Sequence, residues 1–362
     1  MTRPLHHLLL AGVLLCIGTQ SGQAETDHRA IAQAALTNVI RPGYAALSTS
    51  TTALKQKTDA LCAEPSAKAL QATKEAFAAA VDSWSNVEML RFGPVIEDHR
   101  YERLFFWPDP KGIGLRQVEK ALAEKDETVT LADSLADKSV ALQGFPALEY
   151  LLYGDGAEDL AKADPEVGFR CLFAASIATN IDRMAGAVAE EWRDGAEAAK
   201  LFVDPSPNDP LYRAPKDVTL ELSKAFTSGL ELVRDQKLGK PLGTSIKTAR
   251  PRLAAFWRSG LTFPNMIGNL EGVRTLFDKS GFAGVVASES PGVEDSILFD
   301  IDHNIDVLQT IDVPIAEAAR DEQIRAEFEA LRVGLKGARD TAGTMIARGA
   351  GLGFGFNALD GD

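Results

Sequence analysis

The chain has 362 residues, enough for one large domain or two of ordinary size, and a formal net charge of −13. With 45% hydrophobic and 25% charged residues, it has the composition of a soluble globular protein that buries a sizeable core. The excess of acidic side chains argues against nucleic acids and anionic lipids as partners, because both would be repelled.

Residues 1–24 have the pattern of a secretory signal peptide. Arg3 gives a positive start, and the apolar run 8–17 is too short to span a bilayer. Residues 22–24 form a small-x-small cleavage site, so we expect the exported chain to begin at Glu25.

The cysteines bear on anchoring and on redox state. A lipoprotein signal acylated at Cys16 is the alternative to cleavage, but Leu15 stands where a small residue is expected. Removal of the signal leaves Cys62 and Cys171, and such a pair in an oxidising compartment often forms a disulfide. We therefore expect this bond, with two buried free thiols as the other interpretation.

Helices are predicted along the whole chain, because apolar residues recur at helical spacing and strand patterns are scarce. Ser66 is a good N-cap for a helix that extends to Phe92. Proline and glycine clusters at 41–43, 92–94 and 107–114 divide the first helices. Three apolar stripes stand out: Leu70, Phe77, Val81 and Trp84; Leu222, Phe226, Leu230 and Val233; Val293, Ile297, Ile301, Ile305 and Leu308.

The longest stretch without helical periodicity is 204–215, which holds four prolines. It separates two sets of long amphipathic helices. We predict an all-α protein of two four-helix-bundle-like domains packed together, residues 25–203 and 216–362, with 204–215 as the connector.

Polar side chains lie on these apolar faces. At 100° per residue, Glu88 and Arg91 fall on the same helical face as Trp84. Glu149 is the only charged residue in the segment 144–154, GFPALEYLLYG. Such glutamates have little access to water, so they need another source of stabilisation.

A buried carboxylate is costly unless it is paired, protonated or bound to a metal. Arg91, Arg116 and Arg274 are the candidate partners. Two interpretations stay open: a salt-bridge network that joins the bundles, or a polar pocket in which Glu88 and Glu149 bind a metal ion or a small ligand, as inward glutamates do in other bundles. The candidate site residues, which include a matching acid and base from the second half, are Trp84, Glu88, Arg91, Arg116, Gly144, Glu149, Glu271 and Arg274.

Four segments resemble the imelysin family, a group of bacterial periplasmic or membrane-attached proteins that includes a protease and iron-regulated proteins. They are residues 83–95, 103–118, 144–154 and 269–277. The match is better to the predicted-lipoprotein branch than to typical imelysins, and it covers the whole exported chain. The resemblance implies a periplasmic protein with two bundle domains derived from a duplication, and a site near their interface.

The family signature G-x-H-x-x-E reads Gly144 to Glu149 in this chain, with Pro146 at the histidine position. Proline can neither ligate a metal nor carry a proton. Because it lacks a backbone N–H, it also favours a kink here or a new helix that starts at Gly144. No H-E-x-x-H motif compensates for the missing histidine, so peptidase activity is not expected.

The resemblance and the buried glutamates together predict a non-catalytic periplasmic protein that binds a metal ion or small ligand in a carboxylate-rich pocket between two bundles. The resemblance alone suggests iron as the metal, and other periplasmic or outer-membrane proteins of an iron-uptake system as partners. One alternative is an imelysin-type metallopeptidase. The other is an envelope scaffold that binds a protein or polysaccharide through the aromatic-rich segment 84–107.

Overall fold

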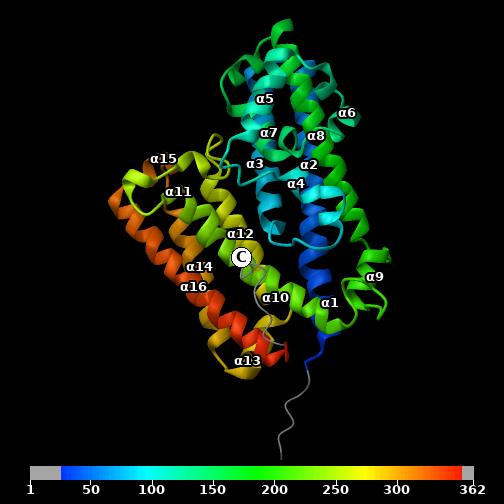
Figure 1. Ribbon diagram of the computed structural model, residues 1–362, viewed down its shortest axis with the longest axis vertical. Coiled ribbons are helices and arrows are strands. Elements are labelled where there is room, and N and C mark those ends of the chain that lie inside the picture. Colours follow the sequence, from blue (N-terminus) through cyan, green and yellow to red (C-terminus); the bar gives the residue numbers. More distant parts are fainter. Residues whose placement is uncertain (1–25, 353–362) are drawn as a thin grey trace, which may run out of the picture.

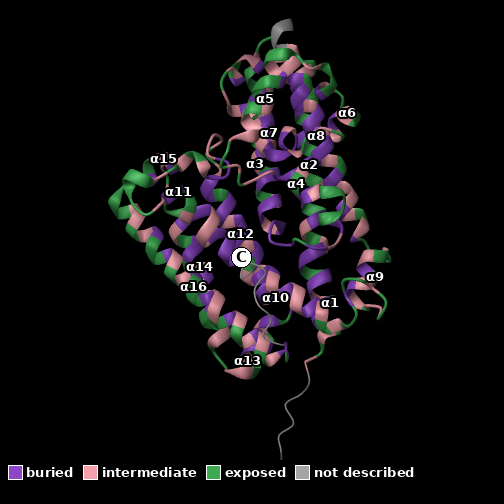
Figure 2. Ribbon diagram, viewed as in Figure 1, coloured by how far each residue is buried: buried purple, intermediate pink, exposed green. Residues whose placement is uncertain are grey.

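All regular structure in the described part of the chain is helical, as the sequence predicts. The computed structural model describes residues 26–352, with the backbone alone for 165–167, so the predicted signal peptide and Cys16 lie outside it. Between residues 26 and 352 no helix is long and apolar enough to cross a membrane. The buried residues line the inward faces of the long helices (Figure 2).

The first half of the chain forms a bundle around α2, α3 and α8, with α7 against α8 (Figure 1). Ser66 caps α3, because its side chain accepts a hydrogen bond of 3.1 Å from the Ala69 N–H. The stripe from Leu70 to Trp84 is buried, as predicted. The helices are α1 (His28–Ala35), α2 (Arg41–Ala63), α3 (Ala67–Val87), α4 (Arg100–Leu104), α5 (Ile113–Glu124), α6 (Ala132–Ala136), α7 (Gly144–Tyr153), α8 (Pro165–Glu191) and α9 (Glu197–Val203).

The second half packs α10, α12, α14 and α16 together, and α12 also packs against α3 of the first half. A π-helical segment, Leu232–Gly239, continues α10. No helix lies in 204–214, the greater part of the predicted connector. The helices are α10 (Pro215–Glu231), α11 (Lys240–Leu242), α12 (Thr262–Lys279), α13 (Phe282–Glu289), α14 (Val293–Gln309), α15 (Ile315–Ala318) and α16 (Glu322–Gly349).

The N-terminal helix is not interrupted at 41–43, contrary to the prediction. A π-helical segment, Leu36–Ile40, joins α1 directly to α2. Pro42 falls at the start of α2, after this wider turn, and so avoids the clash that proline causes inside a regular α-helix. Because α1 packs against α10, one continuous helical rod contacts both halves of the molecule.

The helix that carries Glu149 begins at Gly144, whose φ is +75°. A Cβ on Gly144 would lie 2.3 Å from the carbonyl oxygen of Leu104 and 2.4 Å from that of Arg103. Only glycine fits this position, because both the dihedral and the space exclude a side chain. The glycine of the G-x-x-x-x-E pattern therefore sets α7 directly on the end of α4.

Two glycines on α12 allow it to approach α3 closely. A Cβ on Gly268 would lie 2.7 Å from the Ser85 Cβ, and one on Gly272 would lie 2.2 Å from the carbonyl oxygen of Asn86. Side chains at these positions would force the helices apart. The face of α12 that carries these glycines and packs against α3 also carries Asn265 and Asn269, described below.

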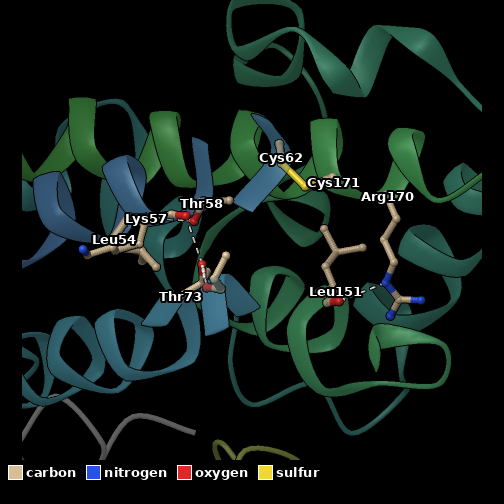
Figure 3. Close-up of a disulfide and its surroundings, with 9 residues drawn as sticks. Leu54, Lys57, Thr58, Cys62, Thr73, Leu151, Arg170 and Cys171 are labelled. Carbon is tan, nitrogen blue, oxygen red and sulfur yellow. Dashed lines mark hydrogen bonds between the residues drawn. A yellow bond between two sulfur atoms is a disulfide. The ribbon is translucent and has the colours of Figure 1, made fainter. Parts of the chain in front are cut away.

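Cys62 at the end of α2 and Cys171 on α8 are joined in a disulfide, the pair that the sequence suggests (Figure 3). Next to it, the Arg170 guanidinium donates to the carbonyl oxygen of Leu151 at 2.9 Å. The bond closes a loop with a sequence separation of 109. It therefore ties the end of α2, the first long helix of this half, to α8, its last long helix.

Replacing both Cys62 and Cys171 by serine should lower the free energy of unfolding by about 2–5 kcal/mol, because a long loop is no longer restrained in the unfolded chain. Urea denaturation of the variant and of the oxidised wild type measures this difference. Wild type that has been reduced should match the variant. A change below about 1 kcal/mol would mean that the loop is restrained by other contacts in the unfolded chain.

Candidate functional site

A cleft of about 770 Å³ lies between α5 and α7 of the first half and the segment 252–258 of the second. This volume falls in the range of small-molecule sites, about 300–1,000 Å³. Its aromatic lining residues are Phe105, Phe106, Trp107, Tyr150, Tyr153, Phe256 and Trp257. Its charged lining residues are Asp109, Lys111, Glu119, Glu149, Asp155, Arg252 and Arg258.

Glu149 lines the cleft although its residue is only 3% exposed. Its Oε1 accepts three hydrogen bonds: from the Arg258 N–H at 3.1 Å, the Ser259 N–H at 2.9 Å and the Ser259 hydroxyl at 2.8 Å. Its Oε2 accepts none from any residue in the range 26–352. Glu149 thus fastens a loop of the second half onto α7 and keeps one oxygen for another donor.

The electrostatics of Glu149 follow from this position. Burial raises the pKa of its carboxyl group, and the hydrogen bonds from Ser259 and the charge of Arg258 only partly oppose this shift. Burial together with the Glu149 charge also raises the pKa of Tyr153 to about 12. Tyr153 therefore remains a neutral hydroxyl at physiological pH.

Arginines lie against aromatic rings at the cleft, on both sides of it. The Arg258 guanidinium lies 4.4 Å from the Trp257 ring centre and 5.3 Å from the Tyr150 ring centre. The Arg252 guanidinium also lies against Trp257, 5.5 Å from the ring centre, and the Arg170 guanidinium lies 5.6 Å from the ring centre of Tyr150. Such cation–π contacts hold the guanidinium planes in fixed orientations. Within residues 26–352, no carboxylate forms an ion pair with Arg252 or Arg258.

A second polar cluster lies where the halves meet, and it is fully enclosed. The Lys237 Nζ lies 2.6 Å from Glu88 Oε2 and donates to Asn265 Oδ1 at 2.5 Å; neither charged side chain is exposed. The Asn269 amide donates to the same Glu88 oxygen at 3.0 Å. The Asn265 amide donates to the Ser85 hydroxyl at 2.6 Å. The partner of Glu88 is therefore a lysine from the π-helical segment of the second half.

Lys237 also contacts the wall of the cleft. Its ammonium group lies 5.5 Å from the ring centre of Phe105 and 5.6 Å from that of Trp107, and both rings line the cleft. Burial lowers the pKa of Lys237 to about 8, although the Glu88 charge opposes this shift. The enclosed cluster therefore lies directly behind the two rings.

None of the three arginines proposed as partners pairs with Glu88 or Glu149. Arg91 lies 4.4 Å from the Tyr101 ring centre, and Arg116 donates to the carbonyl oxygen of Lys111. Arg274 forms an ion pair of 2.5 Å with Asp302 on α14. These corrections share one cause: helical spacing locates a side chain on a face, but the neighbouring helix determines its partner.

The other candidate residues lie in different places. Trp84 is buried against Tyr101 and Phe105, with ring centres 5.2 and 6.0 Å away. Glu271 is half-buried on α12, and burial and the charge of Asp82 raise its pKa. Of the predicted side chains, only Glu149 lines the cleft.

The aromatic-rich segment 84–107 belongs mainly to the core. Its residues Trp84, Phe92, Tyr101 and Phe105 are all buried. A binding groove formed by exposed rings of this segment is therefore not what the structure shows. Of the described residues of this segment, only those at its end, Phe105, Phe106 and Trp107, line the cleft.

Arg258, Ser259 and Lys237 are absent from the sequence-based list. The stretch 250–258, RPRLAAFWR, mixes basic and aromatic residues and could have indicated the cleft wall. No pattern marks Ser259, which acts partly through its backbone N–H. Lys237 has no signal either, because its inward orientation depends on the π-helical turn that carries it.

The carboxylates do not form a metal centre by themselves. Between residues 26 and 352 no group of three or more histidine, cysteine, aspartate or glutamate side chains is placed to hold an ion. Glu88 binds Lys237, and Glu149 has a single oxygen to offer. The two glutamates predicted to share an ion therefore have separate partners, and residues 26–352 offer a bare metal ion no ready set of protein ligands.

Comparisons with known proteins find relatives of this chain in both sequence and structure. The sequence model of the Imelysin family matches residues 40–341. Iron-regulated protein A of Synechococcus elongatus (strain ATCC 33912 / PCC 7942 / FACHB-805) is 22% identical over 210 residues, which cover 57% of this chain and 53% of that protein. The chain thus matches about half the length of this curated relative.

Two solved structures share the fold. An imelysin-like protein from Psychrobacter arcticum 273-4 superposes with a TM-score of 0.74 at 19% identity, covering 91% of this chain and 97% of that one. A putative iron-regulated protein A precursor from Parabacteroides distasonis ATCC 8503 gives a TM-score of 0.72 at 16% identity, covering 90% and 97%. At these identities the likeness establishes the all-helical fold.

Replacing Lys237 by methionine should cost about 3–5 kcal/mol of stability, because Glu88 is left buried without its counter-charge. Adding Glu88→Gln should recover part of this loss, since the amide carries no charge. Lys336→Met removes an exposed ion pair with Asp340 and should change stability by about 0–1 kcal/mol. Urea denaturation of wild type, Lys237→Met, the double variant and Lys336→Met measures these changes. A loss of unfolding free energy in Lys237→Met no larger than that in Lys336→Met would contradict the prediction.

Glu149 should make stability depend on pH in a defined direction. Its pKa in the folded chain is raised above the ordinary value of 4.5. Between pH 4.5 and the folded-state pKa, the folded chain therefore binds more protons than the unfolded chain. The free energy of unfolding of wild type should therefore fall, relative to Glu149→Gln, as pH rises from about 4.5 through the folded-state pKa. Denaturation curves across this range measure the difference. If the stability of wild type instead rises relative to Glu149→Gln as pH increases, the fold stabilises the charged carboxylate and the prediction is wrong.

Proposed function

This chain belongs to the imelysin family, and from that premise we propose that it is a non-catalytic periplasmic protein that binds a small organic ligand in the cleft between its two halves. The observation that carries the proposal is Oε2 of Glu149, an acceptor without a partner in residues 26–352 that opens onto a cleft of ligand size, while the rest of the residue is buried. The surrounding rings and unpaired arginines supply the apolar and polar contacts that such sites use.

The periplasmic location rests on two features. Residues 1–24 have the composition of an export signal. The Cys62–Cys171 disulfide is typical of an oxidising compartment.

The link to iron comes from the names of the relatives, of which two are called iron-regulated. We extend this link to the present chain as a role in iron acquisition, alongside other envelope proteins of an uptake system. Because the residues do not fit a bare ion, iron would enter the cleft within an organic complex that brings most of its own oxygen ligands. The side chains of the cleft would then recognise the organic part.

The lack of catalysis is proposed from the family signature. Pro146 replaces the histidine, and no histidine is found among the described residues that line the cleft. The Glu149 carboxylate is held by three donors from the second half and serves as an acceptor.

Titration of the protein with a panel of sugars, amino acids, organic acids, their ferric complexes and bare metal ions tests the function. Trp107 and Trp257 line the cleft, so tryptophan fluorescence should report binding, with calorimetry as a second readout. We expect an organic compound or its complex to bind with micromolar affinity, and Glu149→Gln to weaken this by about tenfold or more.

Glu271→Gln is the matched control, because Glu271 does not line the cleft. The proposal is wrong if bare ions alone bind, or if Glu149→Gln and wild type bind every compound equally. Circular dichroism of each variant separates lost binding from lost folding.

A further inference from the structure

We propose that the cleft recognises a small hydroxycarboxylate, with the Arg258 guanidinium binding the carboxylate and Glu149 Oε2 accepting a hydrogen bond from the hydroxyl. This inference rests on the proposed function and names the ligand class for the same cleft. It follows from three features of the cleft: an arginine fork without an ion-pair partner in residues 26–352, a carboxylate oxygen beside it that opens onto the cleft, and the charges that surround both.

Arg258 presents a fork of donors. Its guanidinium lies between Trp257 and Tyr150, at 4.4 and 5.3 Å from the ring centres, and its side-chain N–H groups donate to no residue in 26–352. A guanidinium has five N–H donors in a plane, and two of them match the oxygens of a carboxylate. Because the rings already restrict the orientation, little side-chain freedom remains to be lost on binding.

Glu149 supplies the complementary group. Its Oε1 lies 3.1 Å from the backbone nitrogen of Arg258, the charge of Arg258 acts on its carboxyl group, and both residues line the cleft, so one small molecule can reach both. A carboxylate accepts hydrogen bonds only, so its free Oε2 requires a donor on the ligand. The residue is 3% exposed, yet Oε2 is not among the atoms that are shut off from solvent, so this oxygen opens onto the cleft and a donor that enters the cleft can reach it.

The surrounding charges distinguish between ligand donors. An ammonium group would satisfy Glu149, but Arg252 and Arg258 line the same cleft and would repel it. The other acids of the cleft already have partners: Asp109 accepts from the N–H groups of Ile113 and Gly114, Glu119 accepts from the Tyr150 hydroxyl, and Asp155 interacts with the charge of Arg170. A second carboxylate next to Glu149 would be repelled by that residue. A neutral hydroxyl meets neither objection, while the negative group of the ligand lies on the arginine side.

The rest of the cleft suits a ligand with several such groups. Lys111 and Arg252 are exposed, line the cleft and form no ion pair within the described part of the chain, so they can bind further carboxylates. Tyr153 and Phe256 offer apolar surface to a carbon skeleton. The volume of about 770 Å³ leaves room for a tricarboxylate or a sugar acid.

The test compares ligands that differ in one group, titrated into the wild-type protein by calorimetry. Citrate is paired with tricarballylate, which lacks only the hydroxyl, and gluconate is paired with sorbitol, the open-chain analogue in which a CH2OH group replaces the carboxylate. We expect citrate or gluconate to bind, and its partner to bind at least about tenfold more weakly, the effect of losing one charge-assisted hydrogen bond. These comparisons need no variant, so they do not depend on the folding of a mutant.

Variants then assign the groups. Arg258→Gln should weaken binding of the hydroxycarboxylate by about tenfold or more, and Arg258→Lys should restore only part of it, because lysine keeps the charge but not the fork. Arg213→Gln makes the same charge change at an exposed residue outside the cleft and should bind as wild type does.

Two results would overturn the inference in different ways. If tricarballylate or sorbitol binds as tightly as its partner, or another compound of the wider panel binds in its place, and binding still requires Glu149, the ligand class is wrong but the cleft remains a ligand site. If no compound of either panel binds, both the ligand class and the proposed function are wrong.

Discussion

The ion pair between Lys237 and Glu88, with neither side chain exposed, couples the two halves of the molecule. Desolvation of two charges can cost more than their attraction returns. The cluster is also incomplete: Glu88 Oε1, Asn269 Oδ1 and Trp84 Nε1 are buried without a hydrogen-bond partner in the part of the chain that the structure describes. Its contribution is therefore better understood as specificity, since only one register of α12 and the π-helical segment on α3 brings these groups together.

The pair also connects the interface to the cleft. Lys237 lies behind Phe105 and Trp107, and the Trp107 indole N–H donates to the carbonyl oxygen of Leu253 at 3.1 Å. Glu149 holds the next part of the same loop through Ser259. The cleft wall of the second half is thus fixed at both ends by residues of the first, so the cleft exists only when the halves are assembled.

Sequence patterns predicted the features that depend on local chemistry. Helical periodicity and the Ser66 cap identified the helices, and the lone acid in an apolar segment identified Glu149. The partners could not be predicted, because they depend on tertiary contact. Glu88 and Lys237 are far apart in the chain, and Ser259 acts partly through a backbone group that every residue has. The three candidate arginines could not be matched to particular glutamates from the sequence for the same reason, and none of them pairs with Glu88 or Glu149.

The continuous rod formed by α1, the π-helical segment Leu36–Ile40 and α2 has a consequence for how the molecule can move. Its first turns pack against α10 of the second half, and its last turns against α3 and α8 of the first. A rotation of one half about the other would have to bend this rod or detach one end of it, and bending is easiest at the π turn. The rod therefore restrains rotation of one half about the other. Access to the cleft then depends on movements of its side chains and loops.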